Sequence, residues 1–203
     1  MSESVEKVGR GRPKLLNREY VLDVVIQNYR QKGIEGFSIN ELCKTAKVSK
    51  PALYREFGNE DGLMSEALVV YEQRVLAKIF GISQRETSFS QELDNLVLDV
   101  ISQTDTQQDP KGCLFSNMLD SRRVLGELTL AQINRTHQNI ISALEAWIVK
   151  SKANGELTTE MSSAFVAKYI HTQIRYAKCQ LFRGESSQQV TAILKLALSV
   201  FKE

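Results

Sequence analysis

The chain has 203 residues, of which 42% are apolar and 25% are charged, an ordinary composition for a globular protein that buries a core. Its three cysteines are widely spaced and odd in number, which excludes a disulfide framework and CxxC metal spacing, and no apolar run is long enough to span a membrane. The N-terminus has no apolar signal core, so we expect a cytoplasmic protein.

The net charge of +2 is small, but its distribution is uneven. Five basic residues and no acidic residue lie between Lys7 and Arg18. We therefore predict that residues 1–16 form a flexible basic arm that meets a polyanion. A solvated tail with incidental charge is the alternative.

Signals for helix ends define a small N-terminal module. Asn17 is a candidate N-cap for a helix that ends near Lys32, before Gly33. Ser38 and Glu41 have the spacing of a capping box and predict a short helix from Ile39 to Ala46.

A second short helix is predicted from Lys50 to Phe57, with Pro51 in its first turn. Two short helices joined by three residues form a helix-turn-helix. The apolar residues expected to form its core are Ile39, Leu42, Ala46, Val48, Leu53 and Phe57.

The remaining sequence also has helical periodicity and no useful strand pattern. The fold class predicted is all-α with about nine helices: a three-helix module with the helix-turn-helix over residues 17–62 and a larger helical bundle over residues 63–203. The further helices are expected at 59–80, 88–104, 113–121, 124–153, 159–183 and 186–202.

Residues 18–68 closely resemble the DNA-binding domain of the TetR family of transcriptional regulators. The most specific piece runs Val-Ser-Lys-Pro-Ala-Leu-Tyr-Arg-Glu-Phe over residues 48–57, where the family typically reads GVSKGTLYRYF. Two residues depart from the pattern. Lys47 replaces a glycine at a turn that often needs a positive φ, and Glu60 replaces a lysine that commonly approaches a phosphate.

The resemblance implies that residues 50–57 read the major groove of double-stranded operator DNA. Lys50 is expected at a guanine edge or a phosphate, and Tyr54 at a phosphate, although Tyr54 could instead only pack on its helix. Arg10 and Arg12 in the arm resemble minor-groove readers. The full set of predicted DNA contacts is Arg10, Arg12, Ser38, Thr45, Lys50, Pro51, Ala52, Tyr54 and Arg55.

The resemblance also implies a homodimer formed through the last two helices, with two recognition helices about one DNA turn, ~34–36 Å, apart. Both helices carry apolar stripes, which also serve as subunit core in part. Their apolar residues are Ala164, Phe165, Ala167, Tyr169, Ile170, Ile174, Ala177 and Leu181 in one, and Val190, Ile193, Leu194, Ala197, Leu198 and Phe201 in the other.

A small-molecule inducer is expected to bind in the larger domain and release the DNA, with the helix at 59–80 transmitting the change. Taken singly, each candidate wall residue is expected to be core more often than a ligand contact. The candidates are Cys113, Phe115, Met118, Leu119, His137, Ile141, Leu144, Trp147, Tyr169 and Gln173.

Cys113 follows Gly112 at a predicted helix N-terminus, where the helix dipole favours a thiolate. An alternative function is therefore a repressor that senses electrophiles or oxidants through Cys113, whereas most single cysteines are inert. His137 and His171 have no neighbouring Asp or Cys in the sequence, so we expect no metal site and no cofactor.

Rival functions remain at this point. An enzyme is disfavoured because the sequence has no GxSxG, HExxH or P-loop motif and only two histidines. A DNA-binding protein without a ligand would bind with strong salt dependence and no sequence preference. An activator differs from a repressor only in where its operator lies.

Overall fold

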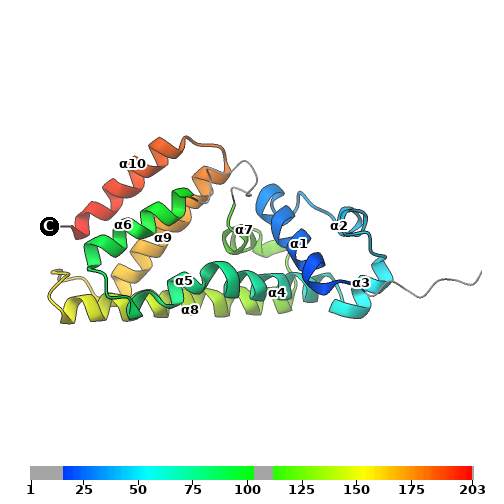
Figure 1. The fold of residues 1–203 in the computed structure, drawn as a ribbon, viewed down its shortest axis with the longest axis horizontal. Coiled ribbons are helices and arrows are strands. Elements are labelled where there is room, and N and C mark those ends of the chain that lie inside the picture. The colour runs from blue at the N-terminus through cyan, green and yellow to red at the C-terminus, as the bar shows by residue number, and fades with distance from the viewer. Residues whose placement is uncertain (1–15, 103–111, 203) are drawn as a thin grey trace, which may run out of the picture.

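The computed structural model describes residues 16–102 and 112–202. Throughout these two ranges the secondary structure is helical, without strands, and forms nine helices when contiguous segments are counted together. Figure 1 shows an elongated molecule with a small N-terminal module at one end and α6, α9 and α10 grouped at the other. The all-α fold predicted from the sequence is confirmed.

The N-terminal module consists of three helices with the predicted limits. They are α1 (Arg18–Lys32), α2 (Ile39–Ala46) and α3 (Lys50–Phe57). The Asn17 side chain caps α1 by accepting a hydrogen bond from the Tyr20 amide, and Gly33 ends the helix with a φ of 78°. Five of the six predicted core residues are buried, namely Ile39, Leu42, Ala46, Leu53 and Phe57, and Val48 packs against them.

A single continuous helical rod leaves this module and runs along the molecule. It comprises α4 (Glu60–Tyr71), a π-helical turn (Glu72–Leu76) and α5 (Ala77–Phe80). The periodicity predicted this helix over 59–80 without any sign of the wider turn. In the π turn Glu72 reaches α8, where its carboxylate accepts hydrogen bonds from Gln132, Thr136 and Asn139 at 2.7–3.1 Å.

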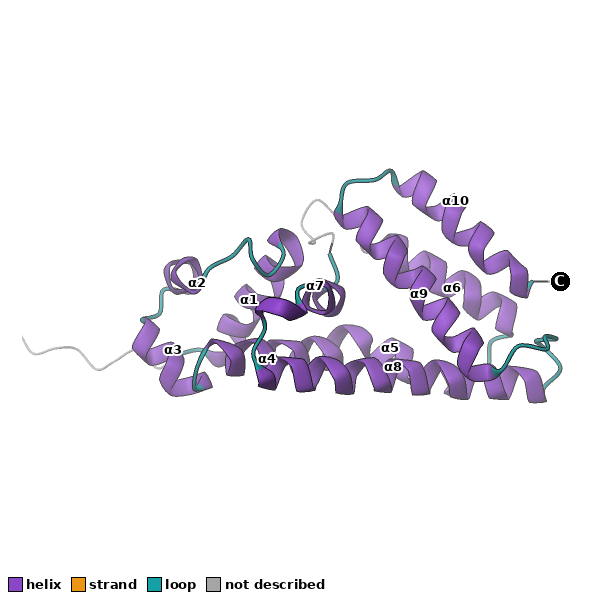
Figure 2. Ribbon diagram, turned by 180° about the vertical axis from the view of Figure 1, so that it is seen from behind, coloured by secondary structure: helices purple, strands orange, loops and turns teal. Residues whose placement is uncertain are grey.

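The larger unit is built around a long helix that packs along the rod. Figure 2 shows this helix below and α6, α9 and α10 rising from its far end, with α7 between them and the N-terminal module. The helices are α6 (Phe89–Ser102), α7 (Leu114–Asp120), α8 (Glu127–Ala153), α9 (Ser163–Phe182) and α10 (Ser187–Leu198).

All five helices begin later than the sequence predicted, three by a single residue and two, α8 and α9, by more. Residues 122–124 form a 3-10 turn, so the helix predicted over 124–153 starts only at Glu127, after Gly126. The helix predicted over 159–183 starts at Ser163, because the Ser162 hydroxyl caps it by accepting a hydrogen bond from the Phe165 amide. At the start of α9 a local side-chain cap thus overrides apolar periodicity.

Among the residues that the structure describes, no helix combines the length and apolar composition needed to cross a bilayer.

Candidate nucleic-acid interface and ligand cavity

The second helix of the helix-turn-helix, α3, presents the predicted reading face. The Ser49 hydroxyl caps it by accepting a hydrogen bond from the Ala52 amide, and Pro51 lies in its first turn. Lys50, Pro51 and Arg55 are exposed, and Ala52 and Tyr54 are partly exposed. The Lys50 ammonium lies 5.5 Å from the centre of the Tyr54 ring, so these two side chains share one face.

The other predicted contacts in the module lie on α2. Ser38 forms the full capping box with Glu41: its hydroxyl accepts from the Glu41 amide, and the Glu41 carboxylate accepts from the Ser38 amide at 2.9 Å. The capping role of Ser38 is therefore confirmed, and its approach to a phosphate stays a prediction. Thr45 is exposed in the last turn of α2. Arg10 and Arg12 lie outside the described residues.

The turn between α2 and α3 adopts the positive-φ conformation that glycine favours, although this chain has Lys47 at that position. Lys47 adopts φ 54° and ψ 42°, the left-handed region, and is the one non-glycine residue with positive φ among those described. A side chain with a Cβ costs about 1–2 kcal/mol in this region. The turn that aims α3 is therefore built with local strain.

Two sets of contacts join the module to the larger unit. On one side Asp61, in the first turn of α4, accepts hydrogen bonds from the backbone N–H groups of Leu128 and Thr129 at the start of α8. On the other side α1 meets α7: the Arg30 guanidinium donates to the Gly112 carbonyl at 2.9 Å, and the Asn117 amide donates to the Tyr29 carbonyl at 2.8 Å. Hydrogen bonds therefore tie α1 to α7 and α4 to α8.

The predicted ligand-wall residues do not surround one cavity. Phe115, Met118, Ile141, Leu144 and Trp147 are buried in the core, whereas Leu119, His137, Tyr169 and Gln173 are partly exposed. Of this set, only Cys113 lines the cavity between α7 and α9.

The other candidates lie at scattered positions. His137 and Ile141 lie along an open groove with Lys168, and Trp147 lies at the far end of α8, stacked on Phe89. The Tyr169 hydroxyl donates to the Ala197 carbonyl at 3.0 Å and joins α9 to α10. A shared ligand role for the whole set has no geometric support.

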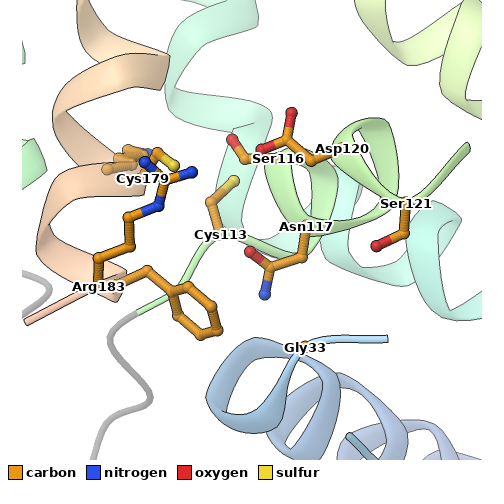
Figure 3. Close-up of a pocket in the computed structure, with 10 residues that line it drawn as sticks. Gly33, Cys113, Ser116, Asn117, Asp120, Ser121, Cys179 and Arg183 are labelled. Carbon is orange, nitrogen blue, oxygen red and sulfur yellow. The ribbon is translucent and has the colours of Figure 1, made fainter. Parts of the chain in front are cut away.

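The cavity between α7 and α9 encloses about 210 Å³ and combines thiols with charged and polar groups (Figure 3). Sequence reasoning missed most of its walls, which come from α1, α7 and α9. The lining residues are Gly33, Cys113, Ser116, Asn117, Asp120, Ser121, Lys178, Cys179, Phe182 and Arg183. The helical spacing of residues 178, 179, 182 and 183 puts them on one face of α9, but only the fold turns that face toward Cys113.

Cys113 is the N-cap residue of α7 and is buried. Its sulfur accepts a hydrogen bond from the hydroxyl of Tyr71, a fully buried residue on α4, at 3.5 Å. Burial raises the pKa of this thiol, but the Lys178 ammonium and hydrogen bonds from Tyr71 and Ser116 outweigh burial and bring the pKa below 9.0. The environment thus makes the thiolate, which is the nucleophilic form, easier to form than in a free cysteine.

The two histidines lie close to each other and to Phe115. The His137 and His171 ring centres are 5.2 Å apart, and each lies 6.2 Å from the Phe115 ring centre. Burial lowers the pKa of His171 to about 4, and the neighbouring His137, Arg175 and Lys178 act in the same direction. Within the described ranges, no group of three or more His, Cys, Asp or Glu side chains could hold a metal ion.

The surface of α9 and α10 includes large apolar side chains that are exposed to solvent. We call this surface the α9–α10 stripe; it comprises Phe165, Tyr176, Ile193, Leu196 and, in the turn directly after α10, Val200. Leu196 is 73% exposed. Most of the apolar residues predicted on these helices instead belong to the subunit core, including Ala167, Ile170, Ile174, Leu194 and Leu198.

The sequence and fold match known regulators. Residues 22–67 match the family model of the bacterial regulatory proteins of the tetR family. The chain is 24% identical over 212 residues to the HTH-type transcriptional repressor ComR of Escherichia coli strain K12, with 97% of this chain and 94% of that protein covered.

Solved structures share the fold at lower identity. A transcriptional regulator of the TetR family from Agrobacterium tumefaciens superposes with a TM-score of 0.82 at 14% identity, over 92% of this chain and 97% of that one. A cysteine mutant of the TetR family transcriptional regulator CifR, solved in complex with 26-base-pair double-strand operator DNA, gives 0.79 at 20% identity, over 94% and 100%.

Proposed function

The chain belongs to the TetR family of bacterial regulatory proteins and is a DNA-binding transcriptional regulator, and from that premise we propose that it is a repressor released by a ligand. In this proposal a homodimer binds a palindromic operator, with residues 17–62 contacting DNA and residues 63–203 binding the ligand and the second subunit. The relative ComR, covered over almost its whole length, is named a repressor, which supports the direction of regulation.

The observation that carries the proposal is the exposed N-terminal face of α3. Lys50, Pro51 and Ala52 form the first turn of α3, and residues at the N-terminal end of a recognition helix read base edges in the major groove. Tyr54 lies beside Lys50, where its hydroxyl can donate to a phosphate. In this proposal Ser38, Thr45 and Arg55 make further contacts to the DNA backbone.

The α9–α10 stripe supports the homodimer. Phe165 and Tyr176 on α9, Leu196 on α10 and Val200 just after it leave an apolar surface exposed in the single subunit. Pairing two such faces by a two-fold axis forms a four-helix interface and duplicates the recognition helix. The paired arrangement matches an operator with two half-sites.

Release of the operator requires a ligand with a preference between two forms of the dimer. The ligand must bind more tightly to the form whose recognition helices are spaced incorrectly for the two half-sites. The cavity between α7 and α9 is a suitable place, because its wall at Asn117 is hydrogen-bonded to the backbone of α1. Displacement of α7 there would move α1 and, with it, the module that carries α3.

Selection of bound sequences from random duplex DNA, at near-physiological salt, tests the proposal. An enriched inverted repeat is expected, and the Lys50→Ala variant should lose enrichment while remaining folded and dimeric. Enrichment of a single half-site would contradict the homodimer. Equal retention of all sequences would contradict sequence-specific reading and favour a nonspecific DNA-binding protein.

A second candidate function is a thiol-based sensor of electrophiles or oxidants acting through Cys113. The favouring observation is its place at the start of α7, beside Lys178 and in contact with Tyr71 of α4. Treatment with N-ethylmaleimide should release operator DNA from the wild type and from Cys43→Ser, but not from Cys113→Ser. Release from Cys113→Ser would contradict this role.

A further inference from the structure

Two of the three cysteines line the same cavity. Cys113 precedes α7, Cys179 lies in the last turns of α9, and both border the 210 Å³ space between these helices (Figure 3). Cys113 is buried and Cys179 is partly exposed. The third cysteine, Cys43, lies on α2 within the DNA-binding module and is not part of this cavity.

Close packing brings the two cysteine-bearing segments together. A methyl group built on Gly112 would lie 2.8 Å from the ring of Phe182, so the backbone before Cys113 rests directly against α9. Phe182 is three residues after Cys179, and residues at this spacing share a helix face. Lys178, the neighbour of Cys179, is close enough for its charge to act on the Cys113 thiol.

We propose that Cys113 and Cys179 form an intramolecular disulfide when the protein meets a hydroperoxide. Cys113 is the attacking thiol and Cys179 the resolving thiol. A disulfide needs the two Cα atoms within about 4.4–6.8 Å, so the proposal requires the two facing segments to bring Cys113 and Cys179 to that separation. The proposal names a modification site, and its effect on DNA rests on the proposed regulator function.

The reaction balances without a cofactor. The Cys113 thiolate attacks the outer oxygen of the hydroperoxide, the O–O bond breaks, and the departing alkoxide takes a proton to leave as an alcohol. Cys113 becomes a sulfenic acid. The Cys179 thiolate then attacks the Cys113 sulfur, the S–O bond breaks, and water leaves. The two thiols lose two electrons in total, and the hydroperoxide is reduced by two.

Formation of this bond changes the partner of Cys113. In the reduced protein its sulfur accepts a hydrogen bond from the Tyr71 hydroxyl on α4, whereas in the disulfide it is bound to α9. The buried Tyr71 hydroxyl is then left without this acceptor, which is unfavourable for a polar group shielded from water. Because α4 directly follows α3, the destabilisation falls on the helix that positions the recognition helix.

The bond itself is tested by mass spectrometry of the full chain after brief treatment with cumene hydroperoxide. The wild type and Cys43→Ser are expected to lose two hydrogen atoms, and digestion should yield one peptide pair that joins Cys113 to Cys179. Cys179→Ser should instead gain oxygen at Cys113, and Cys113→Ser should do neither. Oxygen gain without hydrogen loss in the wild type, or a bond to any other residue, would overturn the proposal.

Operator binding in the same samples separates this inference from the proposed function. Oxidation is expected to weaken binding about tenfold in the wild type and Cys43→Ser, with recovery after dithiothreitol, but to leave Cys179→Ser within about twofold. A mapped disulfide with unchanged affinity would refute its regulatory effect. Failure of the reduced wild type to bind any selected duplex would contradict the proposed function instead.

Discussion

The carboxylate of Asp61 in α4 accepts hydrogen bonds from both the backbone N–H and the hydroxyl of Thr129 in α8, at 2.9 and 2.6 Å. Asp61, which follows α3 in the chain, thus caps the N-terminus of α8 by binding Thr129, 68 positions later. An acidic side chain at this position also has a favourable interaction with the helix dipole. Thr129 is fully buried, so the contact fixes the start of α4 against α8.

Replacing Asp61 with alanine is expected to destabilise the protein by about 0.5–2 kcal/mol, the usual cost of losing an N-cap side chain. Urea unfolding followed by circular dichroism measures this difference. Asp94→Ala is the matched control, because it removes a half-exposed carboxylate paired with Lys202 and should cost less than about 1 kcal/mol. Equal losses of stability in the two variants would show that Asp61 is an ordinary surface acid.

Lys47→Gly is expected to stabilise the protein. Lys47 holds a left-handed conformation at a cost of about 1–2 kcal/mol, and glycine removes this cost at the expense of extra freedom in the unfolded chain. The net gain should be about 0.5–1 kcal/mol in the free energy of unfolding, measured by thermal or urea denaturation.

Lys44→Gly is the control for that substitution, because Lys44 is an exposed residue with ordinary helical geometry in α2. Glycine there should destabilise by about 1 kcal/mol. Stabilisation by Lys47→Gly together with destabilisation by Lys44→Gly would show that the change in stability depends on the backbone conformation at each position. Destabilisation by both variants would show that the turn tolerates lysine without strain.

The sequence predicted the fold accurately where short-range signals determine structure. The capping box at Ser38 and the glycine after Lys32 indicated helix limits that the structure reproduces, because these signals act within one turn of the chain. The start of α8 could not be read in this way. Its capping carboxylate comes from Asp61, and the contact depends on how α4 and α8 pack.

The candidate ligand site was harder to predict for a related reason. Periodicity indicates that Phe115 and Leu144 face inward, but not which interior residues border empty space. Of the predicted walls, Cys113 alone lines the α7–α9 cavity, and its polar partners Lys178 and Arg183 come from α9 and its C-terminal end, far along the chain. Such a site becomes visible only when both helices are placed.

Tyr54→Phe is expected to weaken operator binding by about 1–3 kcal/mol, the worth of one hydrogen bond to a charged group. The measurement is a titration of labelled operator by fluorescence anisotropy at several salt concentrations. Because the hydroxyl is uncharged, the salt dependence should not change. Lys50→Ala should instead reduce the slope of log K against log salt by about 0.9 for each phosphate that the lysine neutralises. Unchanged affinity in Tyr54→Phe would assign Tyr54 to packing alone.

Leu196→Glu is expected to convert the proposed dimer to monomers. Leu196 is the most exposed large apolar residue of the α9–α10 stripe, and a carboxylate there would be buried in the proposed interface. Sedimentation velocity measures the state, and specific operator affinity should fall with it. Val149→Glu changes an exposed apolar residue of α8 outside the stripe and should remain dimeric. A dimeric Leu196→Glu would place the interface elsewhere.

His171 makes stability depend on pH between about 6.5 and 4. Its folded pKa of about 4 lies below the ordinary value of 6.5, so in this interval the unfolded chain binds a proton that the folded protein excludes. Stability should therefore fall with decreasing pH, by about 1 kcal/mol per unit from this group, and level off below pH 4. His171→Phe, which keeps an aromatic ring beside His137 and Phe115, should flatten that slope in urea unfolding. A variant with the wild-type slope would show that the decline arises from other groups, since the pKa of His137 is also lowered by burial and by Arg175, Arg122 and Lys168.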